Sequence, residues 1–124
     1  ERVRESRRLK EIRDQLAVEI EKRVPGAIIN GDIRHALPHM LNVSIPHISS
    51  EYLTLSLDAR GFALSTKSAC REGEESLSHV VVALGGEEWR AAHTLRISSG
   101  RETRENDMGR LVQAILDILT VEGR

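Results

Sequence analysis

Cys70 is the only cysteine in the chain and the side chain best suited to covalent chemistry. It lies in the polar stretch Ser65–Gly73, where Lys67 and Arg71 are nearby cations. A positive charge stabilises a thiolate, so an exposed cysteine beside cations tends to be more nucleophilic. A lone cysteine more often fills space in an apolar run, but the segment that follows this one contains no large apolar side chain. We therefore predict a reactive thiol on a polar, mobile loop.

Arg96 is the second residue whose position indicates a function. Apolar and polar residues alternate over His93–Ser98, as they do in a strand with one buried face. Leu95 and Ile97 are expected to face the core. Arg96 then lies between the hydroxyl side chains of Thr94 and Ser98 on an accessible face. An ordinary surface ion pair is the alternative interpretation of this arginine.

Two other kinds of site receive weaker support. Ser98–Arg101, ahead of an expected helix, could bind an anion through backbone N–H groups, although such a segment is also an ordinary helix entry. Of the histidines, only His35 and His39 have a spacing typical of metal ligands. We expect no metal site.

The composition indicates one globular domain over residues 1–124. The chain is 40% hydrophobic and 30% charged, and its net charge of −1 gives no basis for binding nucleic acid or an acidic membrane. One cysteine cannot form an internal disulfide, which fits a reducing cytoplasm. Neither a membrane span nor a signal peptide is recognisable. Because the chain begins at Glu1, we expect it to be part of a longer polypeptide, or a processed or engineered piece.

Hydrophobic periodicity predicts a two-layer α+β fold, with helices packed on one face of a small, mostly antiparallel sheet. The pattern over 52–59 is ambiguous, because its period of two favours a strand while its flanking residues favour a helix. Thr103 is expected to cap the last helix. The other expected elements are a helix at 2–23, strands at 27–29, 41–45, 61–64 and 93–98, a short helix at 76–84, and a last helix through 108–119.

Two motifs together resemble a known family. Ser65-Thr66-Lys67-Ser68-Ala69-Cys70 and Leu95-Arg96-Ile97-Ser98-Ser99-Gly100-Arg101 are similar to segments of the C-terminal small domain of cysteine desulfurases, which are class V, fold-type I pyridoxal-phosphate enzymes. The family's cysteine motif resembles Ser-Ser-Gly-Ser-Ala-Cys, so Thr66 and Lys67 depart from it. Leu41–Ser44 and Val82–Gly85 also resemble family segments. The resemblance implies that 52–59 is helical.

The resemblance further implies a mechanism. Cys70 matches the nucleophile that takes sulfur from L-cysteine as a persulfide, leaving alanine, and Arg96 matches the arginine that binds the substrate carboxylate. It implies pyridoxal 5′-phosphate in the full-length enzyme, a homodimer, and a sulfur acceptor or iron–sulfur scaffold protein as partner. None of the lysines follows a histidine, as the family's cofactor lysine does. We therefore expect the large cofactor-binding domain to be absent from this chain, and the isolated chain to bind no cofactor and to be inactive.

Lys67 stands where the family has glycine. It could stiffen a turn that uses positive φ, or it could lower the pKa of Cys70. Two alternatives to a cysteine desulfurase stay open: a non-catalytic sulfur-relay or docking module, and a selenocysteine lyase.

Overall fold

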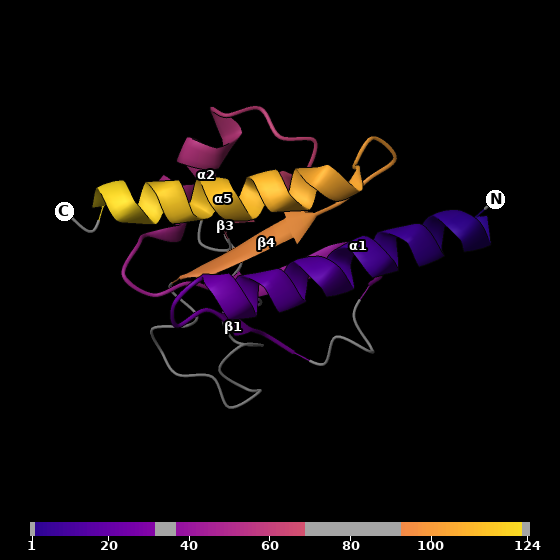
Figure 1. Ribbon diagram of the computed structural model, residues 1–124, viewed down its shortest axis with the longest axis horizontal. Helices are drawn as coiled ribbons and strands as arrows, with labels where there is room; N and C mark the ends of the chain where they lie inside the picture. Colours follow the sequence, from indigo (N-terminus) through magenta and orange to yellow (C-terminus); the bar gives the residue numbers. More distant parts are fainter. Residues whose placement is uncertain (1, 32–36, 69–92, 123–124) are drawn as a thin grey trace.

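A computed structural model describes residues 2–31, 37–68 and 93–122 of the chain (Figure 1). These residues form a helical layer against one four-stranded sheet, which confirms the two-layer α+β prediction. The predicted helix at 76–84 lies outside them. The described elements are α1 (Arg2–Arg23), β1 (Ile28–Ile29), β2 (Met40–Ser44), α2 (Ser50–Asp58), β3 (Ser65–Ser68), β4 (Thr94–Ser98) and α5 (Glu105–Glu122).

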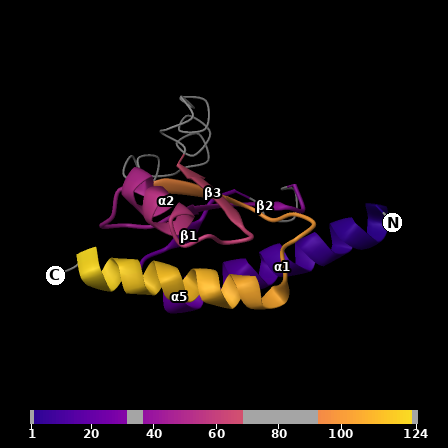
Figure 2. The same cartoon turned by 90° about the horizontal axis from the view of Figure 1, so that it is seen from above.

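The sheet has the strand order β1-β2-β4-β3, and every pair of neighbours is antiparallel. Among the described strands, β4 is therefore an interior strand, while β3 lies at the edge and pairs with β4. Figure 2 shows α1 and α5 side by side against one face of this sheet. The two helices run in the same direction, since Arg8 hydrogen-bonds the segment just before α5 and Arg23 reaches Gln113 further along α5.

α1 forms because its apolar residues recur at helical spacing within a highly charged sequence. Ile12, Leu16 and Ile20 are buried as predicted, and Leu9 on the same stripe is half-buried. Gly26 lies in the turn that follows α1 and has φ of +77°. A Cβ at this position would lie 2.8 Å from Pro46 Cγ. The turn after α1 therefore requires glycine for both its backbone conformation and its space.

The core lies between the helical layer and the sheet, and it is aliphatic. α5 contributes Leu111, Val112 and Ile115, all fully buried, as its apolar stripe predicted. From the sheet, Leu95 and Ile97 pack in the same cluster. Burial of such side chains supplies about 1.5–3 kcal/mol each, so this layer contact fixes the orientation of β4.

α2 resolves the ambiguous segment in favour of a helix. Ser49 caps it by accepting the Tyr52 N–H at 3.2 Å. Leu53 and Leu57, four residues apart, are each 1% exposed, whereas Leu55 between them is 56% exposed. A strand would have put all three leucines on one face, so the exposure of Leu55 explains why the period of two was misleading.

Two local predictions were wrong. The strand expected at 61–64 lies instead at Ser65–Ser68. Gly61, with φ of +67°, begins the connection after α2, and the apolar residues that follow it pack on the core without pairing. An edge strand with one open face can be polar. The apolar residues just before β3 were therefore mistaken for the strand. Thr103 does not provide the expected cap: its hydroxyl accepts the Gly100 N–H, and Asp107 accepts the Arg104 N–H at 2.7 Å.

Within the described ranges, none of the helices combines the length and the apolar character that crossing a membrane requires.

Candidate functional site

Arg96 lies in the middle of β4 and points away from the helical layer. Its neighbours Leu95 and Ile97 are 0% and 2% exposed and belong to the core. Successive side chains of a strand alternate between faces, so Arg96 is on the opposite face and is half-buried. This confirms the predicted alternation. The predicted accessibility of Thr94 was wrong, because Thr94 is 1% exposed.

The strand register places Arg96 in a row of three polar side chains. Asn42 of β2 is its Cα partner on one side, and Lys67 of β3 is its partner on the other. Directly opposite residues of antiparallel strands project from the same face of the sheet. Three strands from three separate parts of the chain therefore carry an amide, a guanidinium and an ammonium side chain at adjacent positions of one face.

The next row on this face explains why Thr94 is buried. Its hydroxyl lies 3.2 Å from the Ser44 hydroxyl, and Asn30 donates to Ser44 at 2.9 Å. Hydrogen bonds offset the cost of burying these polar groups. This row stabilises the pairing of β1, β2 and β4, and it fixes the register that brings Asn42 opposite Arg96.

Asn42 carries an unusual acceptor in the row. Its Oδ1 is buried and has no hydrogen-bond partner among the described residues. A buried acceptor left without a donor costs about 1–3 kcal/mol. The residue was not singled out from the sequence, although the alternation in Leu41–Ile45 put it on the same face as Arg96. An acceptor here suits a ligand that carries an N–H donor.

Cys70 lies outside the described residues. Of the polar loop predicted over Ser65–Gly73, the described part, Ser65–Ser68, is the strand β3, so the prediction was wrong there. The chain reaches Cys70 through β3, whose last residue, Ser68, precedes it by two positions. β3 pairs with β4, the strand of Arg96. The sequence therefore continues toward the thiol from the strand adjacent to the guanidinium.

Because Lys67 stands where the family has glycine, a turn with positive φ was one possibility for its backbone. The residue lies inside β3, paired with Arg96, and not in a turn with positive φ. An extended strand accepts an L side chain without strain. The other two lysines of the chain are on α1, in the helical layer: Lys10, which pairs with Asp14 at 3.1 Å, and Lys22.

The segment after β4 uses its N–H groups internally. Ser99 donates its backbone N–H to the His39 carbonyl at 2.9 Å, and Gly100 donates to the Thr103 hydroxyl at 2.8 Å. These groups are therefore committed and do not favour the anion site considered from the sequence. Over residues 2–31, 37–68 and 93–122, no group of three His, Cys, Asp or Glu side chains could hold a metal ion.

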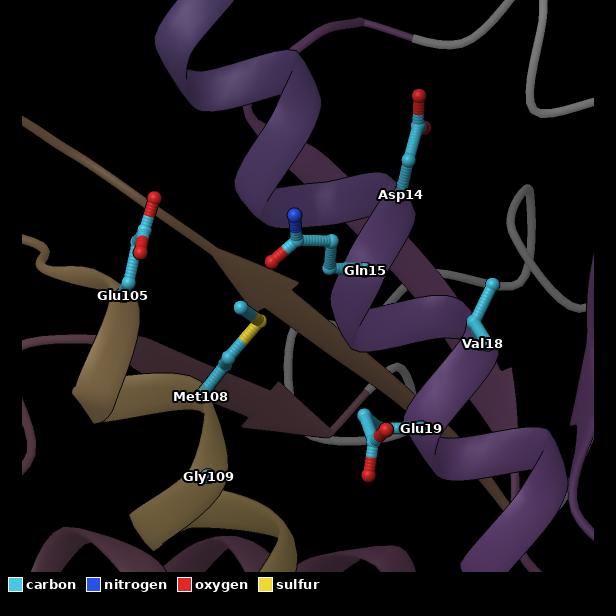
Figure 3. Close-up of a pocket in the computed structure, with 7 residues that line it drawn as sticks. All are labelled: Asp14, Gln15, Val18, Glu19, Glu105, Met108 and Gly109. Atoms are coloured by element: carbon cyan, nitrogen blue, oxygen red, sulfur yellow. The ribbon is translucent and has the colours of Figure 1, made fainter.

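A hollow of about 470 Å³ lies between α1 and α5, on the opposite side of the sheet from Arg96 (Figure 3). Its lining residues are Asp14, Gln15, Val18, Glu19, Glu105, Met108 and Gly109. Figure 3 shows Gln15 and Met108 extending into the space between the helices.

Among the carboxyl groups that line this hollow, Asp14 accepts hydrogen bonds from two cations, Lys10 and Arg13. Burial is the largest influence on its pKa and raises it, but hydrogen bonds from Lys10 and Arg13 outweigh burial, so the pKa lies below its usual value. The group is ionised and paired at neutral pH, which makes it a poor proton donor. The row around Arg96 remains the better candidate site.

No family model matches this chain. A cysteine desulfurase of Azotobacter chroococcum is 33% identical over 115 residues, which are 93% of this chain and 29% of that protein. Cysteine desulfurase IscS of Photorhabdus laumondii is 36% identical over 111 residues, 90% of this chain and 27% of that protein. The chain thus spans less than a third of the length of these relatives.

Solved structures show the same fold. A NifS-like protein superposes with a TM-score of 0.77 at 23% identity, covering 96% of this chain and 29% of that one. A NifS-like protein from Rickettsia africae gives a TM-score of 0.69 at 19% identity, with 94% and 29% covered. At this level of identity the structures establish the fold and nothing finer.

Proposed function

Because this chain belongs to the cysteine desulfurase family, as a counterpart of its C-terminal small domain, we propose that it works as one part of an enzyme that removes sulfur from L-cysteine. In this proposal Arg96 binds the carboxylate of L-cysteine, and Cys70 receives the sulfur. The observation that supports it most directly is Arg96, which stands on the face of the sheet away from the helices and on the strand next to β3. The sequence continues from β3 to Cys70.

The described residues do not fit a pyridoxal-phosphate site. Such a cofactor needs a lysine for its imine, a partner for its ring and a cradle for its phosphate. Lys10 and Lys22 belong to the helical layer, and Lys67 lies on an edge strand. Tyr52 is 46% exposed on α2, and the Phe62 ring lies under Arg110, 5.6 Å from the guanidinium carbon. We propose that the cofactor is held by a further domain of the full-length protein.

The role proposed for Arg96 follows from the geometry of its side chain. A guanidinium offers a planar fork of N–H donors that pairs with both oxygens of a carboxylate. Since Arg96 lies on an interior strand whose other face is packed in the core, its backbone is held firmly. The substrate carboxylate would therefore be bound in a defined orientation.

The role proposed for Cys70 is that of a sulfur acceptor. Its thiolate attacks the sulfur of L-cysteine, and an S–S bond forms as the C–S bond breaks. The electron pair of the broken bond stays with the carbon, which takes up a proton and becomes the methyl group of alanine. The enzyme retains a persulfide for transfer to an acceptor or an iron–sulfur scaffold protein. We further propose that the full-length enzyme is a cytoplasmic homodimer.

The full-length gene product that carries this chain provides the test. Incubated with L-cysteine, it should form alanine, and intact-mass analysis should show one sulfur atom added per chain. Cys70→Ser should abolish both signals, whereas Ser99→Ala, a hydroxyl change in the segment after β4, should leave them. Alanine production that persists in Cys70→Ser would refute the role of this thiol.

The alternatives give different results in the same preparation. A sulfur-relay module would gain sulfur from a complete desulfurase or from polysulfide but would form no alanine itself. A selenocysteine lyase would act faster on selenocysteine than on cysteine.

A further inference from the structure

Lys67 lies directly across from Arg96 on the neighbouring strand. Its side chain is exposed, and its backbone is extended within β3. Two cations here occupy directly opposed positions of adjacent antiparallel strands. An anion placed between them would be attracted by both charges.

Backbone hydrogen bonds define the spacing of the row. Ser99 donates to His39 and Ile45 donates to His93 between β2 and β4, so the odd-numbered residues of these strands form the hydrogen-bonded pairs. Arg96 therefore forms a non-hydrogen-bonded pair with Asn42, with Cα atoms about 4.5 Å apart. Its own N–H and C=O point the other way, toward β3. Lys67 and Arg96 are accordingly a hydrogen-bonded pair, with Cα atoms about 5.5 Å apart.

This spacing allows both cationic groups to meet one small anion. An ionised carboxylate has two oxygens with about four acceptor positions, and an arginine fork uses only two of them. Lysine supplies a compact charge on a flexible stem, so it can approach the remaining positions without a fixed geometry. A carboxylate seated on Arg96 therefore still has acceptors to offer to the Lys67 ammonium group.

We propose that Lys67 is a second carboxylate-binding residue, which together with Arg96 determines the affinity of the site for the α-carboxylate of an amino acid. This inference rests on the proposed function, because it takes the anion to be the carboxylate of L-cysteine. Lys67 acts by direct contact with that group, and Arg96 sets its orientation.

Binding of L-alanine to the full-length protein, measured by calorimetry, tests the inference without any turnover. L-alanine has the same carboxylate as L-cysteine, and L-alaninamide is the matched ligand without that charge. Lys67→Gln should weaken L-alanine binding about tenfold, equivalent to about 1.4 kcal/mol, and leave L-alaninamide binding unchanged. Lys67→Arg should restore most of the affinity. Lys22→Gln, an equal charge change in the helical layer, is the control variant and should have no effect.

The kinetic form of the experiment separates this role from an effect on the thiol. With L-cysteine as substrate, Lys67→Gln should raise KM about tenfold and change kcat less than about twofold. A fall in kcat with an altered pH profile and unchanged L-alanine affinity would overturn the inference. It would show that Lys67 acts on the Cys70 thiol instead of the carboxylate.

The outcomes for the inference and for the proposed function are distinguishable. If the protein forms alanine from cysteine but Lys67→Gln binds L-alanine as tightly as the unmodified protein, the inference fails and the function stands. If Lys67→Gln weakens L-alanine binding but no alanine is ever formed from cysteine, the carboxylate site stands and the desulfurase function fails.

Discussion

Replacing Arg96 with glutamine should reduce kcat/KM for L-cysteine by about 10²- to 10⁴-fold. The reason is the loss of two charge-assisted hydrogen bonds to the substrate carboxylate, each worth about 1.5–3 kcal/mol, or together about 3–6 kcal/mol, at about 1.4 kcal/mol for each factor of ten. Because Arg96 projects from the face opposite the core residues Leu95 and Ile97, the substitution opens no cavity in the core, and the free energy of unfolding should change by less than the roughly 2–5 kcal/mol that a core truncation costs. Arg96→Lys keeps the charge but not the planar fork of donors, so its kcat/KM should lie between that of the unmodified protein and that of Arg96→Gln.

The measurement is the initial rate of alanine formation by the full-length protein, with denaturant unfolding of the same samples. Arg60→Gln is the matched control, since Arg60 is exposed just after α2 and outside the sheet. It removes the same charge and should leave kcat/KM unchanged. The reasoning would be refuted if Arg96→Gln kept kcat/KM within about threefold of the unmodified protein, or if Arg60→Gln lost as much.

Two further predictions concern stability. The pKa of Asp14 is lowered in the folded protein. The stabilising effect of its charge is therefore present above the pKa of an unfolded aspartate, about 3.9, and is lost as the pH falls through the folded value. Asp14→Asn should lower the free energy of unfolding at pH 7, and urea titrations should show the difference from the unmodified protein shrinking below about pH 4. A difference that is constant from pH 7 to pH 2 would contradict this. Ile115→Ala, at a position with 0% exposure, should cost about 2–5 kcal/mol in the same titrations, while Val121→Ala, at a position 67% exposed, should cost less than about 0.5 kcal/mol. Equal costs at the two positions would show that α5 does not pack as described.

Periodicity predicted the layers of this fold because the two long helices carry regular apolar stripes. Ile12, Leu16 and Ile20 repeat at a spacing of four, and each is buried where the stripe required. Leu95 and Ile97 likewise defined the buried face of β4. Where one face of an element is buried against a large core, the pattern of side chains and the structure agree.

The predictions failed where the chain is short or lies at an edge. β3 is polar because it is an edge strand, so no apolar alternation marked it, and the apolar residues before it were mistaken for the strand. Lys67 was consequently assigned to the cysteine loop. Its position beside Arg96 depends on which strands pair and in what register, and pairing between segments so far apart in sequence leaves no local signal.

The candidate site was predicted in part. Arg96 was identified, and its direction is confirmed by the burial of its neighbours. Asn42 was missed because an amide in an alternating strand is unremarkable until its partner strand is known. The substrate-binding role of Arg96 stays a prediction. So does the role of Cys70, which lies outside the described part of the chain.

The bond between Arg8 and the segment before α5 has a consequence for biosynthesis. The Arg8 guanidinium donates to the carbonyl of Thr103 at 2.6 Å and to that of Gly100 at 3.2 Å, contacts that span 95 and 92 residues of sequence. A ribosome adds about 5–20 residues per second, so α1 is made about 5–20 seconds before its partner segment exists. During that interval its apolar stripe has no sheet or α5 to cover it. The apolar stripe of α1 therefore stays exposed to water during synthesis and is covered only after α5 has been made.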